Sequence, residues 1–283
     1  MIYISSSCIK AKTIKESVTI LAEVGFNNIE LSGGTQYYSS FETDLIKLQD
    51  KYGLNYQLHN YFPPPPNHFV LNLASINKDI YNNSIEFAKK AISLSKKLGG
   101  TRYGIHAGYL IDFMPIEAGK KIVYREQSNR LKGINLFKNA WDILNDEAGD
   151  EVKLYIENNV YSNSNFSTFS NNCPLLLVDS NGYMELKEKI DFKLLLDVAH
   201  LKVSVNTLNL DLFQELTTLL PISDYIHLSD NDGLHDQNKS IAKNNSLFST
   251  INKFSLKNKC ITLEIYENID EILKTHETIN NIL

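Results

Sequence analysis

Residues 193–230 read KLLLDVAHLKVSVNTLNLDLFQELTTLLPISDYIHLSD. A short apolar run over 193–197 is followed by a helical pattern over 208–220 and by a second apolar run over 225–228. The first run ends at Asp197 and the second carries His227 next to its end, two side chains that can ligate a metal. Strand, helix and strand in this order predict a βαβ unit, in which both strands end on the same side of a parallel sheet.

The same unit repeats along the whole chain. Apolar, β-branched runs predict eight strands, at 2–6, 28–31, 56–59, 103–106, 153–157, 193–197, 225–228 and 261–265. Helical patterns lie at 14–24, 80–98, 119–145, 208–220 and 247–254, and a last one closes the chain at 269–283. Eight units of about 35 residues fill the 283-residue chain, which predicts the α/β class and a single (β/α)8 TIM barrel domain over residues 1–283.

The main alternative is a doubly wound parallel sheet. That fold needs a glycine-rich phosphate-binding turn after its first strand, and this chain has Ser5-Ser6-Ser7-Cys8 there. Length alone suggests roughly two domains, but no Pro/Ser-rich linker divides the sequence. The barrel is therefore the preferred prediction.

Composition excludes several classes of protein. Hydrophobic residues make up 43% of the chain, which excludes global disorder, and no apolar run approaches the roughly 18 residues of a membrane span. The N-terminus lacks the pattern of a signal peptide, and the three cysteines have no metal-binding spacing, so we expect a cytoplasmic protein. A net charge of −5 with few arginines argues against a nucleic-acid partner.

Polar residues stand at nearly every predicted strand end, where the strands of a barrel meet at one mouth. They include five of the seven histidines. The residues are Glu30, His59, His106, Glu157, Asp197, His200, His227, His235, Asp236 and Glu264. Three carboxylates and one imidazole, at Glu157, Asp197, His227 and Glu264, suit one divalent ion such as Mn2+, Mg2+, Co2+ or Zn2+. These residues also have purely structural alternatives. Asp197 could be a helix N-cap, His227 a core histidine, and the two glutamates could face solvent.

An ordered set of short motifs carries a resemblance to a known family. The motifs are Gly25-Phe26-Asn27-Asn28-Ile29-Glu30-Leu31, His59-Asn60-Tyr61-Phe62, Leu71-Asn72-Leu73-Ala74, His106-Ala107-Gly108, Ile156-Glu157-Asn158, Leu196-Asp197-Val198-Ala199-His200, His227-Leu228-Ser229-Asp230 and Leu263-Glu264. Together they resemble the xylose isomerase-like barrel superfamily, which contains sugar isomerases, sugar epimerases and endonuclease IV-type repair enzymes.

The resemblance implies two kinds of metal site. In the isomerases and epimerases one metal is held at positions matching Glu157, Asp197, His227 and Glu264, and the two glutamates are also the acid–base pair. In the endonuclease IV type three zinc ions are held, with further ligands matching His59, His106, His200 and an Asp-x-His motif. Here that motif reads Asp236-Gln237-Asn238, and an amide is a poor zinc ligand, which puts the third metal in doubt.

We therefore expect a metal-dependent isomerase or epimerase of a small sugar or sugar derivative, with Glu157 and Glu264 as catalytic residues. Substrate contacts are expected from His59, His106, His200, Glu30, Asp236 and Tyr61. A multi-zinc phosphoester hydrolase, a keto-sugar or cyclitol dehydratase and an inactive binding scaffold remain as alternatives. Barrels of this kind often pair, so a homodimer is a further expectation, and Lys202 is the nearest candidate to bind a substrate phosphate.

Overall fold

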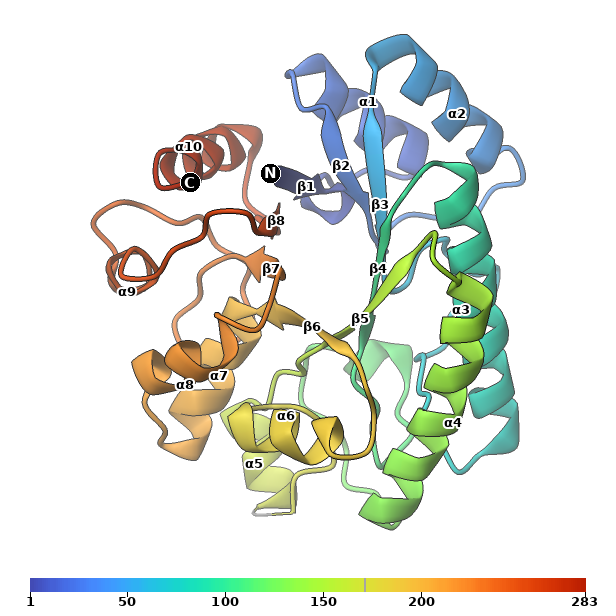
Figure 1. The fold of residues 1–283 in the computed structure, drawn as a ribbon, viewed down its shortest axis with the longest axis vertical. Helices are drawn as coiled ribbons and strands as arrows, with labels where there is room; N and C mark the ends of the chain where they lie inside the picture. The colour runs from blue at the N-terminus through green and yellow to red at the C-terminus, as the bar shows by residue number, and fades with distance from the viewer. Residues whose placement is uncertain (171) are drawn as a thin grey trace.

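Eight parallel strands form a closed barrel at the centre of the molecule (Figure 1). The computed structural model describes residues 1–170 and 172–283. The strands pair in chain order, and β8 pairs with β1 to close the ring. Their bounds are β1 Ile2–Ser5, β2 Asn28–Leu31, β3 Asn55–His59, β4 Arg102–His106, β5 Lys153–Glu157, β6 Lys193–Asp197, β7 Tyr225–Leu228 and β8 Cys260–Leu263. The predicted (β/α)8 TIM barrel is confirmed, and so is each predicted strand.

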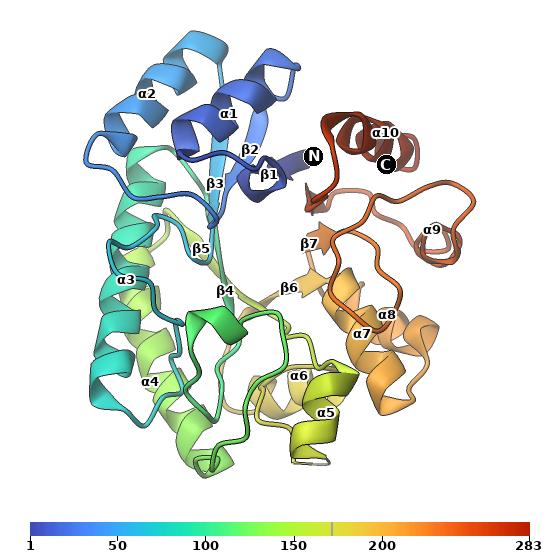
Figure 2. The same ribbon diagram turned by 180° about the vertical axis from the view of Figure 1, so that it is seen from behind.

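Helices surround the barrel on its outside (Figures 1 and 2). They are α1 Ile14–Glu23, α2 Phe41–Tyr52, α3 Lys78–Lys97, α4 Arg130–Ala148, α5 Asn163–Phe169, α6 Ser180–Lys187, α7 Val198–Leu208, α8 Leu212–Leu219, α9 Ser246–Ile251 and α10 Ile269–Asn280. Several begin at an Asn or Asp whose side chain accepts a hydrogen bond from the first turn, as Asn77 does in α3 and Asp211 in α8. Of the helices described, none is both long and apolar enough to cross a membrane.

The helix predictions are less accurate than the strand predictions. The predicted helices at 14–24, 80–98, 247–254 and 269–283 correspond to α1, α3, α9 and α10. The helix predicted from Gly119 is wrong in its first part, because α4 begins only at Arg130, where the Asn129 side chain accepts from the Lys132 amide. Gly119 itself has a φ of +69°, which no helix contains. The prediction at 208–220 corresponds to α8 and includes only the last residue of α7. No pattern predicted the rest of α7, nor α2, α5 or α6.

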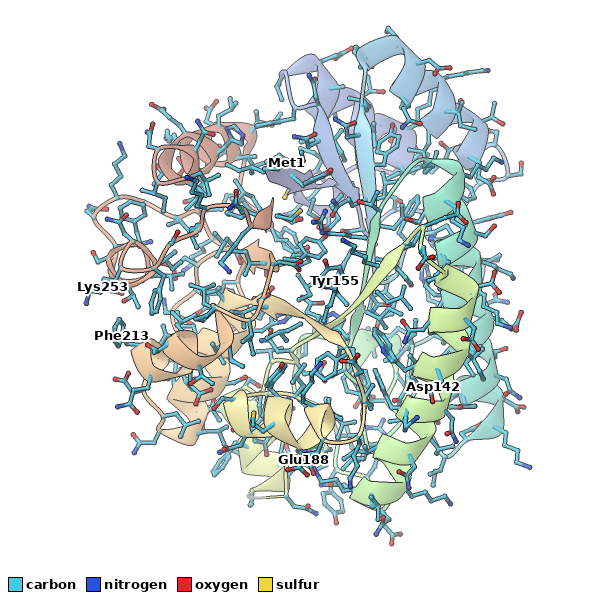
Figure 3. The ribbon with its side chains drawn as sticks, viewed as in Figure 1. Met1, Asp142, Tyr155, Glu188, Phe213 and Lys253 are labelled. Carbon is cyan, nitrogen blue, oxygen red and sulfur yellow. The ribbon has the colours of Figure 1, made fainter. Side chains whose placement is uncertain are left out.

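The apolar core has three separate parts. The largest part lies between strands and helices and includes Ile29, Ile105 and Ile226 from the strands and Val18, Ile92 and Trp141 from the helices. A second part includes Tyr109, Tyr161 and Leu175. The smallest part lies inside the barrel and consists of Tyr3, Tyr155, Leu195, Tyr225 and Cys260. Figure 3 shows Tyr155 among the strands, whereas Asp142 and Lys253 lie at the periphery.

The strand register places the predicted site above this inner cluster. Successive side chains of a strand point to opposite faces, so residues two apart point the same way. Glu157, Asp197 and His227 each stand two residues after a member of the inner cluster, and Glu264 stands four residues after Cys260. All four are therefore directed into the carboxyl-terminal mouth of the barrel, where TIM barrels carry their active sites.

Candidate functional site

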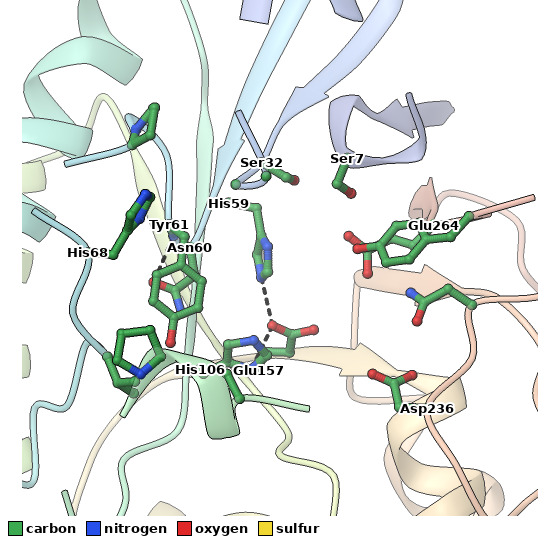
Figure 4. A pocket seen from close by; sticks show the side chains of 18 of the residues that line it. Ser7, Ser32, His59, Asn60, Tyr61, His68, His106, Glu157, Asp236 and Glu264 are labelled. Atoms are coloured by element: carbon green, nitrogen blue, oxygen red, sulfur yellow. Dashed lines mark hydrogen bonds and ion pairs between the residues drawn. The ribbon is translucent and has the colours of Figure 1, made fainter. Parts of the chain in front are cut away.

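The predicted metal and catalytic residues gather around one carboxylate, that of Glu157. It ends β5, and its neighbours come from the ends of other strands. Glu157 Oε2 lies 2.6 Å from His59 Nε2 and 3.0 Å from His106 Nδ1. Glu157 Oε1 lies 3.4 Å from His227 Nδ1 and 3.8 Å from His200 Nδ1. Figure 4 shows His59 and His106 pointing toward Glu157, with Glu264 and Asp236 across the pocket.

Three buried polar atoms around Glu157 have no hydrogen-bond partner, namely Glu157 Oε1, His227 Nδ1 and His106 Nδ1. Glu157 Oε1 and His227 Nδ1 face one another, and both residues are at most 1% exposed. Glu264 Oε2 lies 3.7 Å from the same nitrogen, and oxygens or nitrogens of Glu157, Asp197 and His227 lie within 4.8 Å of one another. Unsatisfied buried polar atoms are costly, and a divalent cation would satisfy both Glu157 Oε1 and His227 Nδ1. Glu157, Asp197 and His227 therefore fit such an ion as a set, and Glu264 lies beside His227 as the fourth candidate ligand.

Asp197 serves both the fold and this cluster. Its Oδ1 accepts a hydrogen bond from the His200 backbone amide at 2.7 Å, which caps α7. Its Oδ2 has no such bond and lies 3.8 Å from His200 Nδ1. Asn158 holds the Asp197 backbone from both sides, since its Oδ1 accepts from the Asp197 amide and its Nδ2 donates to the Asp197 carbonyl. The helix cap and a ligand role are thus compatible, because each uses a different oxygen.

The remaining predicted histidines form two further groups. His59, His106 and Glu157 offer ligand atoms within 4.8 Å of one another, so they could hold a second cation beside the first. His200 Nδ1 lies 3.0 Å from the Asn158 carbonyl oxygen, and its Nε2 lies 3.3 Å from Asp236 Oδ2. Asn238, which stands where a third zinc ligand would be, lines the same cavity as His200 and Asp236.

Among the predicted substrate-contacting residues, Glu30 alone does not line the main cavity. Its side chain is fully buried. Both of its oxygens lie 3.2 Å from His227 Nε2, on the opposite side of that imidazole from Glu157. The structure thus places Glu30 beneath the cluster, in contact with a predicted ligand.

The electrostatics separate the two catalytic candidates. Burial raises the pKa of Glu264 to about 7. Burial acts in the same direction on Glu157, but the neighbouring His106 and His59 hold the pKa of Glu157 well below its usual range. Burial lowers the pKa of His106 to about 4. His227 keeps a pKa well above its usual value in spite of burial, because Glu30 and Glu264 lie beside it.

A cavity of about 600 Å3 opens above the cluster. The predicted residues that line it are His59, Tyr61, His106, Glu157, His200, Asp236 and Glu264. Tyr61 lines the cavity next to Gly33, where a Cβ would stand 2.9 Å from the Tyr61 Cβ. Among the residues described, no lysine or arginine lines this cavity. Lys202 instead donates to Asp230 Oδ1 and to the Asn231 carbonyl, both at 2.6 Å.

A second cavity of about 400 Å3 adjoins the first and shares Tyr61, His106, His200 and Asp236 with it. Lys120 and Lys121 lie in its wall, together with apolar side chains such as Phe113 and Ile122. The mouth of the barrel thus has an acidic, histidine-rich part and a neighbouring part that contains two lysine side chains.

Sequence patterns assigned no role to two polar residues of the main cavity, Asn60 and His68. Asn60 is 2% exposed, lines the cavity and has an Nδ2 without a hydrogen-bond partner. His68 follows the proline run 63–66 and also lines it, although no strand-end pattern marks it. Asn60 stands directly after a predicted strand, so its position was a usable signal. The sequence gives no such signal for His68, because its position depends on the conformation of the loop that follows β3.

The chain is similar to known proteins over nearly its whole length. Residues 18–282 match the family described as xylose isomerase-like TIM barrel. No curated protein matches the sequence.

Solved structures of several enzymes share the fold. A D-tagatose 3-epimerase-like protein superposes with a TM-score of 0.73 at 18% identity, covering 99% of this chain and 96% of its own. A D-psicose 3-epimerase from Clostridium cellulolyticum H10, solved with D-tagatose, gives 0.67 at 13% identity, with 99% and 97% covered. Endonuclease IV from Thermus thermophilus gives 0.62 at 11% identity, with 99% and 98% covered. At these identities the likeness shows a common fold.

Proposed function

Because this chain belongs to the xylose isomerase-like TIM barrel family, we propose that it is a divalent-metal-dependent isomerase or epimerase of a sugar or sugar derivative. The similar structures include sugar 3-epimerases, which supports a substrate of this class. The substrate cavity also fits an uncharged polyol, because histidine, tyrosine and amide groups line it and no described lysine or arginine does.

The unpartnered atoms of Glu157 and His227 carry this proposal. Glu157, Asp197, His227 and Glu264 would hold one cation between them, each contributing an oxygen or nitrogen that the fold leaves free. All four sit at or beside strand ends, so little side-chain entropy is lost when they bind. A bound divalent cation would polarise a substrate carbonyl and stabilise the negative charge that develops on its oxygen.

The two glutamates can divide the proton transfers. Glu157 is the ionised partner, since His59 and His106 stabilise its carboxylate, and it can accept the proton alpha to the carbonyl. Glu264 lies across the same cavity and holds a proton more readily, because burial raises its pKa to about 7. Two carboxylates with separated pKa values suit return of the proton to the opposite face or to the adjacent carbon. His200, Tyr61 and Asn60 are placed to bind substrate hydroxyls.

Solvent exchange tests the assignment of Glu264. We expect the Mn2+-loaded protein in D2O to exchange the proton at C3 of D-tagatose or D-fructose, or at a neighbouring carbon, which proton NMR follows as loss of that signal. Glu264→Gln should abolish conversion to the deuterated epimer or isomer, because an amide cannot return the proton, whereas exchange through Glu157 without conversion can persist. Metal content is measured in both proteins, since Glu264 is also a proposed ligand.

Glu267→Gln is the matched control, because it makes the same chemical change on an exposed residue that bonds the Ser240 amide outside the site. It should exchange at the wild-type rate. Conversion to the epimer or isomer at the wild-type rate in Glu264→Gln contradicts the assignment. Absence of exchange by the wild-type protein on a panel of ketoses contradicts a ketose substrate.

One observation favours a second candidate, a multi-metal phosphoester hydrolase. His59 and His106 converge on Glu157 so closely that a second cation could share this carboxylate. Against a three-metal site, Asn238 stands in place of a histidine beside Asp236. Metal content separates the candidates: about one ion per chain supports the isomerase, and two or three support the hydrolase.

A further inference from the structure

The floor of the site contains a carboxylate that the mechanism above does not use. Glu30 lies on β2, one residue before the end of that strand, and its side chain is fully buried. A buried carboxylate needs partners, and Glu30 has three: Thr262 Oγ1 donates to its Oε2 at 2.9 Å, Ser32 Oγ donates to its Oε1 at 3.4 Å, and His227 Nε2 lies 3.2 Å away. The Ser32 hydroxyl is itself held, because it accepts from Ser5 Oγ at 2.9 Å.

These contacts fix where the proton on His227 must be. An ionised carboxylate only accepts hydrogen bonds, so the Nε2 of His227 has to be the donor. The other ring nitrogen, Nδ1, then carries the lone pair whenever the imidazole is neutral. That nitrogen faces Glu157 Oε1 at 3.4 Å and Glu264 Oε2 at 3.7 Å, which is where the proposed cation would sit.

We propose that Glu30 is a positioning residue, which holds His227 as its Nε2–H tautomer and directs Nδ1 at the cation. The proposal rests on the proposed function only in taking His227 as a metal ligand. A carboxylate behind a metal-binding histidine fixes the ring orientation and makes the ligand more basic. Glu30 therefore acts through His227 and does not touch the substrate, in keeping with its place outside the cavity.

The geometry also allows a competing role, in which Glu30 is itself a ligand. Ligand atoms of Glu30, His59, His227 and Glu264 lie within 4.8 Å of one another. One observation favours positioning: both Glu30 oxygens already accept from hydroxyl donors.

Metal titration and nitrogen NMR together test the proposal. In the 15N-histidine-labelled, Zn2+-loaded protein, long-range 1H–15N spectra should show His227 protonated at Nε2, with a slowly exchanging proton. Glu30→Ala should remove this slow exchange and weaken Mn2+ binding, measured by calorimetry, by roughly 10–100-fold. Glu30→Gln keeps an acceptor oxygen of the same shape, so it should retain the Nε2–H tautomer and lose less affinity than Glu30→Ala.

The matched control is Gln57→Leu. Gln57 pairs with Glu30 in the strand register, is 1% exposed and faces Cys260 instead of a histidine of the site. It should lose stability without losing Mn2+ affinity, which separates a positioning effect from general loosening of the barrel.

A metal-bound Nε2 with the proton on Nδ1 would overturn the proposal, as would unchanged Mn2+ affinity in Glu30→Ala. If Glu30→Ala does not fold, two measurements on Glu30→Gln decide the proposal. They are the tautomer of His227 and the Mn2+ affinity compared with that of Gln57→Leu. These measurements need no substrate. If the protein exchanges no ketose proton, the proposed function fails while the role of Glu30 can still be tested.

Discussion

Some side chains at the barrel mouth stabilise the ends of strands and helices and also position the residues of the candidate site. Asp197 caps α7 with one oxygen and leaves the other facing the cluster. Asn158 joins the ends of β5 and β6 through two hydrogen bonds to the Asp197 backbone. Asn159 likewise donates to the Ala107 and Leu176 carbonyls. The proposed ligands are therefore held by neighbours whose side chains bond the backbone at the strand ends, which is what a preorganised site requires.

Gly104 is the residue that gives His59 its space. It lies on β4, and a Cβ there would stand 2.6 Å from Leu195 Cδ2 and 2.9 Å from His59 Cδ2. We expect Gly104→Ala to destabilise the fold by about 1–3 kcal/mol through overpacking and to displace His59 from Glu157. Urea unfolding measures the first effect, and a crystal structure or histidine NMR measures the second.

A double variant separates the two clashes. Adding Leu195→Val to Gly104→Ala removes the nearest clashing atom, so part of the stability should return while His59 stays displaced. Unchanged stability and an unchanged His59 position in Gly104→Ala would show that the barrel interior yields more easily than these distances indicate.

Residue types were easier to predict than residue roles. Carboxylates and histidines at strand ends are visible in the sequence, and Glu157, Asp197, His227 and Glu264 do lie close together. The depth of each side chain is not visible, because it depends on the stagger of strands in a closed barrel. Glu30 was expected to contact substrate for this reason, and it lies beneath the site, one residue before the end of β2.

At the scale of elements, strands were predictable and the segment before α4 was not. A strand covered on both faces must be a continuous apolar run, which is a strong signal. The segment from Met114 to Arg125 is ordered by polar contacts that leave no periodic pattern. Glu117 accepts from the backbone amides of Met114 and Val123 and from two nitrogens of Arg125. The apolar periodicity of α4, with Ile134 and Trp141 on its buried face, was therefore extended too far back, to Gly119.

Glu117 should hold this segment closed beside the second cavity. Its hydrogen bonds to Arg125 lower the pKa of Glu117 to about 2, from an ordinary value of 4.5. Because the pKa is depressed in the folded protein, the stabilisation is complete above about pH 4.5 and is lost as the pH falls toward 2. Carbon NMR should find the Glu117 carboxyl titrating near pH 2.

Loss of this carboxylate should open the segment at neutral pH. We expect Glu117→Ala to increase tryptic cleavage after Lys120 and Lys121 about tenfold, because about 1.4 kcal/mol of lost local stability corresponds to that factor. Glu126→Ala is the control, since this neighbour is exposed. Equal cleavage rates in the two variants would mean that other contacts, such as Asn165 with Ile122 and Lys120, suffice to hold the segment.

At the scale of the whole molecule, the topology follows from the order of the elements. Eight consecutive parallel strands with helical crossovers of one hand place each strand beside the next, and closure removes both sheet edges. The contacts across the mouth join residues nearly 200 positions apart, such as Glu30 and His227, and no local pattern encodes them. The single-domain, homodimer and cytoplasmic assignments stay predictions.

The barrel also concentrates negative charge at its centre, where Glu157, Asp197 and Glu264 are all buried. A cation that binds only the folded chain stabilises it by about 2.7 kcal/mol at a free concentration one hundred times Kd. We therefore expect Mn2+ to raise the melting temperature by roughly 5 °C or more, and chelation to reverse the rise.

Asp197→Asn should abolish this gain while leaving α7 capped, because asparagine is as good an N-cap as aspartate. Asp179→Asn is the matched control, since Asp179 caps α6 in the same way and lies outside the site. Calorimetric titration of the same proteins counts the ions. A single Mn2+ binding step that is lost only in Asp197→Asn supports the site at Glu157, Asp197, His227 and Glu264. A second Mn2+ binding step that survives in Asp197→Asn supports an ion at His59 and His106. A melting temperature that Mn2+ raises equally in both variants would place the bound ion away from Asp197.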